Sequence, residues 1–106
     1  MPKYLIKASL TIDGVKGTLQ EGGTSRLATV KELFESIGGK LEAFYYAFGD
    51  TDAYVIVDAP DNVTTAALSM AVTASGAVVT ETVVLLTPEE LDQVAEMTID
   101  YRPPGG

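Results

Sequence analysis

Residues 40–61 of the chain read KLEAFYYAFGDTDAYVIVDAPD and contain two runs rich in aromatic and β-branched residues, Leu41–Phe48 and Ala53–Asp58. Between the two runs lies Gly49-Asp50-Thr51, a short polar turn. Such runs on both sides of a glycine-containing loop predict a β-hairpin. Pro60-Asp61 is expected to end the second strand and to begin a helix. The hairpin therefore forms the centre of the architecture.

The chain before the hairpin predicts one strand and two helices. Side chains alternate along Tyr4–Leu10, so one face is expected to pack against helices and the other to be more polar. The expected helix-facing residues are Tyr4, Ile6, Ala8 and Leu10, and the polar face carries Lys3, Leu5, Lys7 and Ser9. Thr11–Glu21 predicts a short, weak helix. A firmer helix is expected over Arg26–Ile37, with Thr24 as its cap and Gly38 as its end.

The chain after the hairpin predicts a helix, a strand and a last helix. Asp61 is a good cap for a helix over Val63–Ala74. Its small residues are expected to let it lie close to a sheet; they are Ala66, Ala67, Met70, Ala71 and Ala74. Val78–Leu86 predicts a central strand. Thr87, Pro88 and Glu90 form the pattern of a capping box, and the helix that they begin is expected to run to about Met97.

The predicted order is β-α-β-β-α-β-α, which is typical of an α+β, ferredoxin-like antiparallel sheet with helices on one face and an added C-terminal helix. We expect a single domain over residues 1–98 and a tail, 99–106, whose Pro and Gly residues exclude regular structure. The other face of the sheet needs a cover that so short a chain cannot supply. The expected partner is a second copy, in a dimer or an assembly of dimers.

Composition excludes several classes of function. The net charge of −8 argues against nucleic acid as a partner, and it is typical of a bacterial-type cytosolic protein. The sequence has no His and no Cys, so we expect no haem, no transition metal and no cofactor that needs those ligands. No secretory signal and no membrane-spanning stretch is recognised, so a cytoplasmic protein without a membrane partner is expected.

Several segments in this order and spacing resemble the GYD-domain family, small α+β proteins of uncharacterised function. They are KYLIKASLT (3–11), the helix from Arg26 that ends in Ile37-Gly38-Gly39-Lys40, GDTDAYVIVDAPD (49–61), ASGAVVTETV (74–83) and DYRPPG (100–105). Gly49 and Asp52 keep the pattern around the family's namesake tripeptide, and Thr51 stands at its tyrosine position. The resemblance implies a dimeric α/β barrel, in which two open sheet faces close on each other. That wider group includes cofactor-free monooxygenases, isomerases, haem enzymes and ligand-sensing domains, and a shared fold does not select among them.

Lys7 and Glu81 are the first candidate pair. The first and last strands are expected to be antiparallel neighbours, in a register that places Lys7 beside Glu81 and Lys3 beside Leu85. Burial beneath a partner would leave this pair either to specify the pairing of the sheets or to bind a polar ligand.

The remaining candidates are two tyrosines, an arginine and an aspartate. With a three-residue turn, Tyr46 is expected to face Tyr54 across the hairpin, either as cross-strand packing or as two phenols that orient a planar substrate. Arg26 opposes the dipole of its helix, which suggests that it binds a carboxylate from a ligand, from Asp50 or from Asp52. The alternative readings are a solvated arginine and aspartates that form the turn.

Two functional hypotheses follow from these candidates. In the first, a cavity between paired sheets binds or converts a small aromatic or oxygenated molecule without a cofactor. Its expected lining is Lys7, Tyr46, Tyr54 and Glu81, with Arg26 near the mouth, and Asp52 is a further candidate for binding the ligand. In the second, the same residues only build a ligand-sensing or assembly interface without catalysis.

Overall fold

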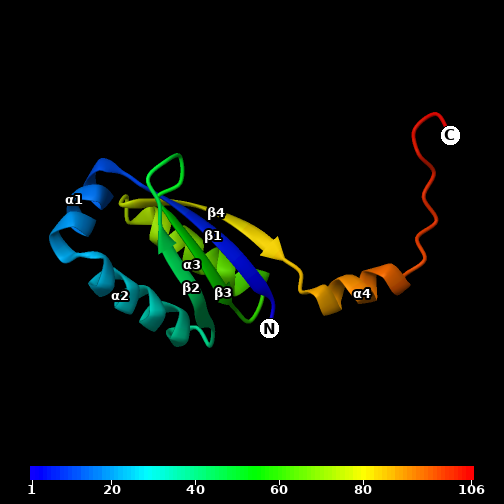
Figure 1. Ribbon diagram of the computed structural model, residues 1–106, viewed down its shortest axis with the longest axis horizontal. Coiled ribbons are helices and arrows are strands. Elements are labelled where there is room, and N and C mark those ends of the chain that lie inside the picture. Colours follow the sequence, from blue (N-terminus) through cyan, green and yellow to red (C-terminus); the bar gives the residue numbers. More distant parts are fainter.

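Four antiparallel strands form one sheet in the order β2-β3-β1-β4 (Figure 1). The computed structural model describes residues 1–106. The strands are β1 (Lys3–Leu10), β2 (Lys40–Tyr46), β3 (Ala53–Asp58) and β4 (Val78–Leu85). The first and last strands pair side by side, so the expected ferredoxin-like arrangement is confirmed. The strand expected to be central, β4, lies instead at an edge of the sheet.

Three helices pack with the sheet and a fourth extends beyond it. They are α1 (Ile12–Glu21), α2 (Gly23–Ser36), α3 (Asn62–Ala74) and α4 (Pro88–Glu96). α2 packs against β2 and α3 against β4, whereas α4 leads away from the sheet (Figure 1). None of the four helices combines the length and the apolar composition needed to cross a membrane.

The core lies between the sheet and the helices α2 and α3. Its largest fully buried side chains are Tyr4 and Val57, and they cluster with Ile6, Phe34, Val55, Ala59 and Leu68. The Tyr4 hydroxyl donates a hydrogen bond of 2.6 Å to Asn62 Oδ1, so the one polar atom of this buried ring has a partner. Tyr4 and Ile6 thus occupy the helix-packed face of β1, as the alternation predicted.

Local signals set most helix ends. The side chains of Asp61 and Thr87 accept hydrogen bonds from the backbone N–H groups of Thr64 and Glu90, and the Glu90 carboxylate completes the capping box. The Thr24 cap was wrong, because α2 begins at Gly23 and its N-cap is Gly22 at φ 87°, without a side-chain cap. The positive φ favours glycine at position 22, and it lets the chain turn directly from α1 into α2.

The face that α3 turns to the sheet differs from the expected one. Thr65 and Leu68 are its buried residues, and Val72 packs against the core. The small-residue face (Ala66, Ala67, Met70, Ala71 and Ala74) is exposed. The larger Leu68 and Val72 bury more apolar area than alanines would, and this burial decides the rotation of the helix.

The hairpin pairs one residue out of the expected register. Tyr45 lies opposite Tyr54 and Tyr46 lies opposite Ala53, so the loop has six residues, 47–52, where a three-residue turn was expected. A shift of one residue moves every side chain to the other face of a sheet. Phe44 and Tyr46 therefore point to the helices, and the prediction that Tyr46 faces Tyr54 was wrong.

Candidate functional site

A cavity of about 120 Å³ lies between the sheet and the helices α2 and α3. Apolar side chains form most of its wall: Ile6, Ala8, Leu10, Val30, Leu33, Phe34, Phe44, Ala53, Val55, Leu68, Val72 and Val78. Four hydroxyl-bearing residues, Thr18, Thr29, Ser69 and Thr80, and the side chains of Arg26 and Tyr46 supply its polar groups. Such a cavity suits a small apolar body with one or two polar contacts.

Arg26 and Tyr46 mark the polar rim of this cavity. Arg26 stands in the first turn of α2, where a cation meets the positive end of the helix dipole. Its side chain is 35 % exposed, and its Nη1 lies 3.6 Å from Glu21 Oε2, beyond hydrogen-bond distance. Within the chain, the donors of the Arg26 guanidinium have no hydrogen-bond partner. Glu21 is therefore the carboxylate beside Arg26, and of the expected partners neither Asp50 nor Asp52 forms an ion pair with it.

Gly23 brings the start of α2 against the ring of Tyr46. A Cβ atom at position 23 would lie 3.2 Å from Tyr46 Cε2, so a larger residue would push the ring away. The rings of Phe44 and Tyr46 also meet edge to face, with centroids 5.0 Å apart. Both contacts hold the Tyr46 ring in place at the cavity.

The Tyr46 phenol stays protonated at neutral pH. Partial burial raises the pKa of this phenol above its usual 10.0; the Arg26 charge opposes this rise, and the Glu21 charge adds to it. Tyr46 is 43 % exposed, so its hydroxyl can reach a ligand at the cavity mouth. The rim thus offers a cation whose donors are free and a neutral O–H donor, a pair that suits a carboxylate.

The open face of the sheet carries a second group of predicted residues in one row. Across the four strands, Tyr45 pairs with Tyr54, Tyr54 with Lys7, and Lys7 with Glu81. The predicted register of Lys7 with Glu81 and of Lys3 with Leu85 is confirmed. No ion pair joins Lys7 to Glu81 within the chain. The next row is apolar: Ala43, Ile56, Leu5 and Val83.

A family comparison decides what kind of chain this is. The model of the GYD domain matches residues 4–95. The chain belongs to the GYD-domain family. Searches of curated proteins and of solved structures return no match.

Asp52, at the GYD hairpin loop, has a structural role in this chain. Its Oδ2 accepts a hydrogen bond of 2.7 Å from the Leu10 N–H, and its own N–H donates one of 2.8 Å to the Ala8 carbonyl. Ser9 Oγ also donates to the Asp50 carbonyl at 3.0 Å. These bonds attach the loop to the end of β1.

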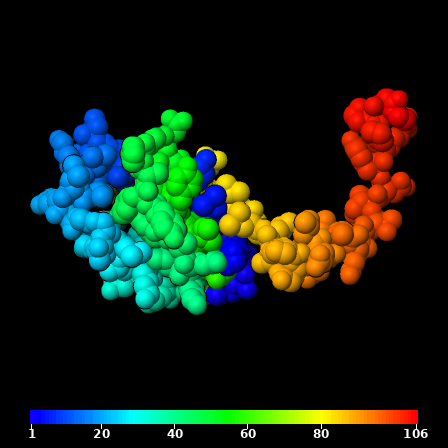
Figure 2. Space-filling model, in the orientation of Figure 1, coloured from blue at the N-terminus to red at the C-terminus, as the bar shows by residue number.

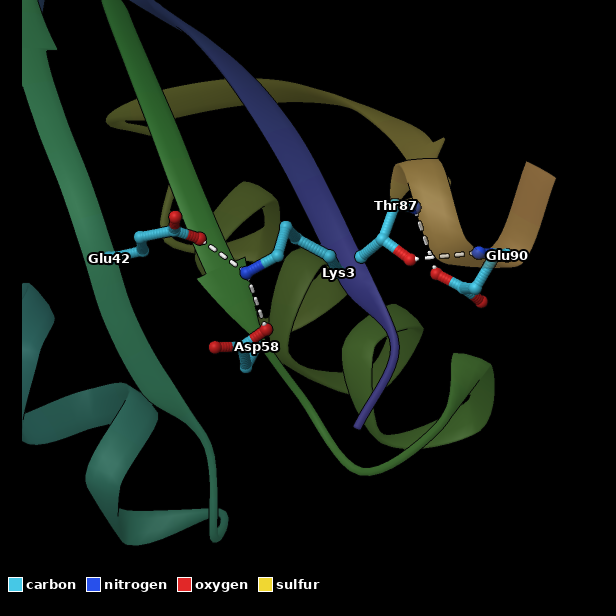
Figure 3. A network of polar contacts seen from close by, with 5 residues as sticks. All are labelled: Lys3, Glu42, Asp58, Thr87 and Glu90. Carbon is cyan, nitrogen blue, oxygen red and sulfur yellow. Dashed lines mark hydrogen bonds and ion pairs between the residues drawn. The ribbon is translucent and has the colours of Figure 1, made fainter. Parts of the chain in front are cut away.

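One ionic cluster of this GYD domain had no counterpart among the predicted site residues. Lys3 Nζ donates to Asp58 Oδ1 at 2.9 Å and also to Glu42, so one lysine joins three strands of the sheet (Figure 3). The bonds to Glu42 and then Asp58 raise the pKa of Lys3. Glu42 reaches the open face of the sheet, where Lys3 lies, because the register shifts between Leu41 and Ala43. Side chains do not alternate regularly through such a bulge, so the sequence pattern did not reveal this cluster.

The six candidate residues therefore separate into three places. Arg26 and Tyr46 meet at the helix-side cavity, and Lys7, Tyr54 and Glu81 form a row on the open face. Asp52 holds a loop. Tyr45 completes the open-face row and was missed, because the expected register assigned that place to Tyr46.

Proposed function

We propose that this GYD-domain protein binds, without a cofactor, a small molecule that carries a carboxylate on an aromatic or short aliphatic body. The observation that supports the proposal is the apolar cavity with Arg26 and Tyr46 at its rim. The apolar body would enter the cavity, and the carboxylate would accept hydrogen bonds from the guanidinium and the phenol. In this proposal the ligand lies between the sheet and the helices, whereas the sequence suggested a cavity between two paired sheets.

The size of the cavity limits the ligand to about one six-membered ring. A dry protein cavity of about 150 Å³ holds benzene, and this one is about 120 Å³. Benzoate and short-chain monocarboxylates such as butyrate are therefore the right probes. The cavity wall holds no carboxylate and no imidazole that could act as a general base, so binding is the activity that this site supports best.

Isothermal titration of the protein with benzoate tests the proposal. We expect Arg26→Gln to weaken binding about 10- to 100-fold, since a hydrogen bond to a charged group contributes about 1.5–3 kcal/mol. Tyr46→Phe should weaken it by a smaller factor, and Arg102→Gln, in the tail, serves as the matched control for loss of one positive charge. Benzamide, which has the same ring but no charge, should bind much more weakly than benzoate.

Two results would contradict the proposal. One is equal binding of benzoate by the Arg26→Gln and Arg102→Gln proteins. The other is unchanged binding by Ala8→Leu, because the larger side chain at position 8 would fill the cavity. A melting curve of each variant separates loss of the site from loss of the fold.

We also propose that two copies associate through their open sheet faces, which makes an assembly module the second candidate function. The apolar row of Leu5, Ile56 and Val83 supports it, because no helix of the chain packs on that face. The adjacent Lys7 and Glu81 carry opposite charges. A two-fold rotation can therefore bring each residue near its opposite on the partner.

A further inference from the structure

The C-terminal helix α4 stands away from the rest of the molecule. Figures 1 and 2 show α4 and the chain after it as an arm that projects from the sheet and helices. The molecule is 56 Å long but only 33 and 22 Å in its other two dimensions. No residue of α4 is buried, and no helix or strand packs along it. The arm thus has no partner within its own chain.

The helix α4 is nevertheless well formed and amphipathic. Its capping box fixes the first turn (Figure 3). Leu91, Val94 and Ala95 lie on one side, whereas Glu89, Asp92 and Glu96 lie on the opposite side, as spacings of three and four residues require. Leu91 is 58 % exposed and Val94 is 51 % exposed. An isolated nine-residue helix is marginal in water, so this apolar side needs a surface to pack on.

An uncharged, partly apolar groove, which matches the apolar side of α4, runs beside α3 and the edge strand β4. It has a volume of about 580 Å³ and is lined along α3 by a stripe that includes Ala66, Met70 and Ala74. Thr82 and Val84 of β4 form its other side, and no charged residue lines it. Met70 is 73 % exposed and Val84 is 59 % exposed. The groove therefore leaves apolar surface uncovered on the helix side of an edge strand.

We propose that α4 of a second copy lies in this groove, and that two copies exchange their arms reciprocally. The nine residues of α4 span about 14 Å, and the thirteen of α3 about 20 Å, so the groove can hold the whole of α4. The alanines let the two helices approach closely, and Leu91 and Val94 cover Met70. The acidic side of α4 then faces water, which suits a groove without charged residues.

The occupant is a second copy because the arm leads away from its own groove. Only Leu86 and Thr87 separate the end of β4 from Pro88. The Thr87 N–H and side chain are both engaged with Glu90, which fixes the first turn of α4, and from this start α4 leads outward from the sheet (Figure 1). Each copy presents the same arm and the same groove, and a reciprocal contact of this kind closes a two-fold dimer.

Disulfide trapping tests the exchange of arms. The chain has no cysteine of its own, so only the introduced cysteines can form a disulfide. One protein carries Ala66→Cys in the groove, and a second carries Val94→Cys in the arm. The two are mixed, incubated so that copies exchange, and mildly oxidised. We expect a covalent dimer that contains one chain of each kind, is seen by mass spectrometry and is lost on reduction. Lys31→Cys, on the exposed side of α2, replaces Ala66→Cys in the control mixture.

Each alternative occupant gives a distinct result. A chain with both Ala66→Cys and Val94→Cys that forms a disulfide at the mass of one chain would show that the arm covers its own groove, and would overturn the proposal. Equal yields with Lys31→Cys and Ala66→Cys, or no disulfide in the mixture, would also overturn it. In the same mixture, Leu91→Ser added to the Val94→Cys chain should lower the yield of the covalent dimer at least tenfold, while Asp92→Ser added to that chain should not.

Discussion

At Gly14 the addition of a single methyl group is expected to destabilise the fold. A Cβ atom at this position would lie 2.0 Å from the carbonyl oxygen of Ala77, and a backbone atom cannot move aside as a side chain can. Glycine here lets the start of α1 lie against the turn that leads into β4. The packing between these two segments therefore depends on one missing methyl group.

We expect Gly14→Ala to destabilise the protein by roughly 1–3 kcal/mol, as an overpacked buried site does. Gly17→Ala is the matched control, because nothing lies within 4 Å of its added Cβ. In the same helix, that change should stabilise by about 0.5–1 kcal/mol. Urea unfolding of the three proteins measures both effects, and equal stability of the two variants would refute the close approach at Gly14.

Asp61 gives a second prediction for a single residue, and this one depends on pH. The hydrogen bonds from the backbone and then the side chain of Thr64 lower the pKa of Asp61 below 3.8. The folded pKa is below the unfolded one, so the stabilisation is complete above about pH 3.8 and is lost as the pH falls through the folded value.

The Asp61→Asn protein should keep the cap but lose this dependence. The difference in urea midpoint between it and the original protein should be constant above pH 5 and shrink below about pH 3.8. Asp50→Asn, in an exposed loop, is the control for removal of one acid. A difference that stays constant down to pH 2 would show that the Asp61 charge contributes nothing to the cap.

Among the elements, the starts of α1, α3 and α4 could be predicted, whereas the start of α2, the buried face of α3 and the register of the hairpin could not. Thr11, Asp61 and Thr87 cap helices through bonds to residues three positions ahead, so the signal lies within the local sequence. The rotation of α3 depends on which side chains fill the space above the sheet, which distant residues determine. The hairpin register depends on whether its loop has an odd or an even number of residues, and composition does not encode that number.

The pair of strands β1 and β4 supports a prediction about Lys7 and Glu81. The two residues are neighbours in register but form no ion pair in the single chain. Once two open faces close on each other, loss of one charge should strand the other, at a cost of roughly 3–5 kcal/mol. Glu81→Gln and Lys7→Met should each destabilise the associated protein, and the double change should recover much of the loss.

A double-mutant cycle by urea unfolding at high and at low protein concentration measures this coupling. In the dissociated chain the coupling should fall to about 0–1 kcal/mol, as expected for an exposed pair. Simple additivity of the two changes at high concentration would show that the pair is not buried by association.

At the scale of the whole molecule, the sheet leaves one face without a cover, and this leads us to predict a homodimer or an assembly of dimers. Light scattering at micromolar concentration should give a mass of at least twice 11.2 kDa. Leu5→Lys on the open face should lower that mass, because it places a charge in the apolar row, and Lys16→Gln on α1 should not. A single chain at high micromolar concentration would rule out this assembly.

The candidate site could be predicted in its members but not in its location. Alternation along β1 and β4 placed Lys7 beside Glu81, because period-2 patterns and antiparallel pairing are both local rules. Arg26 and Tyr46 were expected in one site and do line one cavity. The predicted side of the sheet was wrong for Tyr46, because a shift of one residue in the hairpin register moves this side chain from the open face to the helix side.

The shift between Leu41 and Ala43 has a consequence for how the family can vary in length. Strand β2 consists of two stretches in different phase, joined at Glu42. Loss of one residue at this joint would straighten the strand and leave Tyr45 and Tyr46 on their present faces. Relatives one residue shorter here could keep both aromatic positions and lose only the Glu42 carboxylate, one of the two that Lys3 binds. The neighbouring strand β3 has no bulge between Ala53 and Asp58 to absorb a change of length. An insertion or deletion of one residue there would move the side chains of half the strand to the opposite face of the sheet.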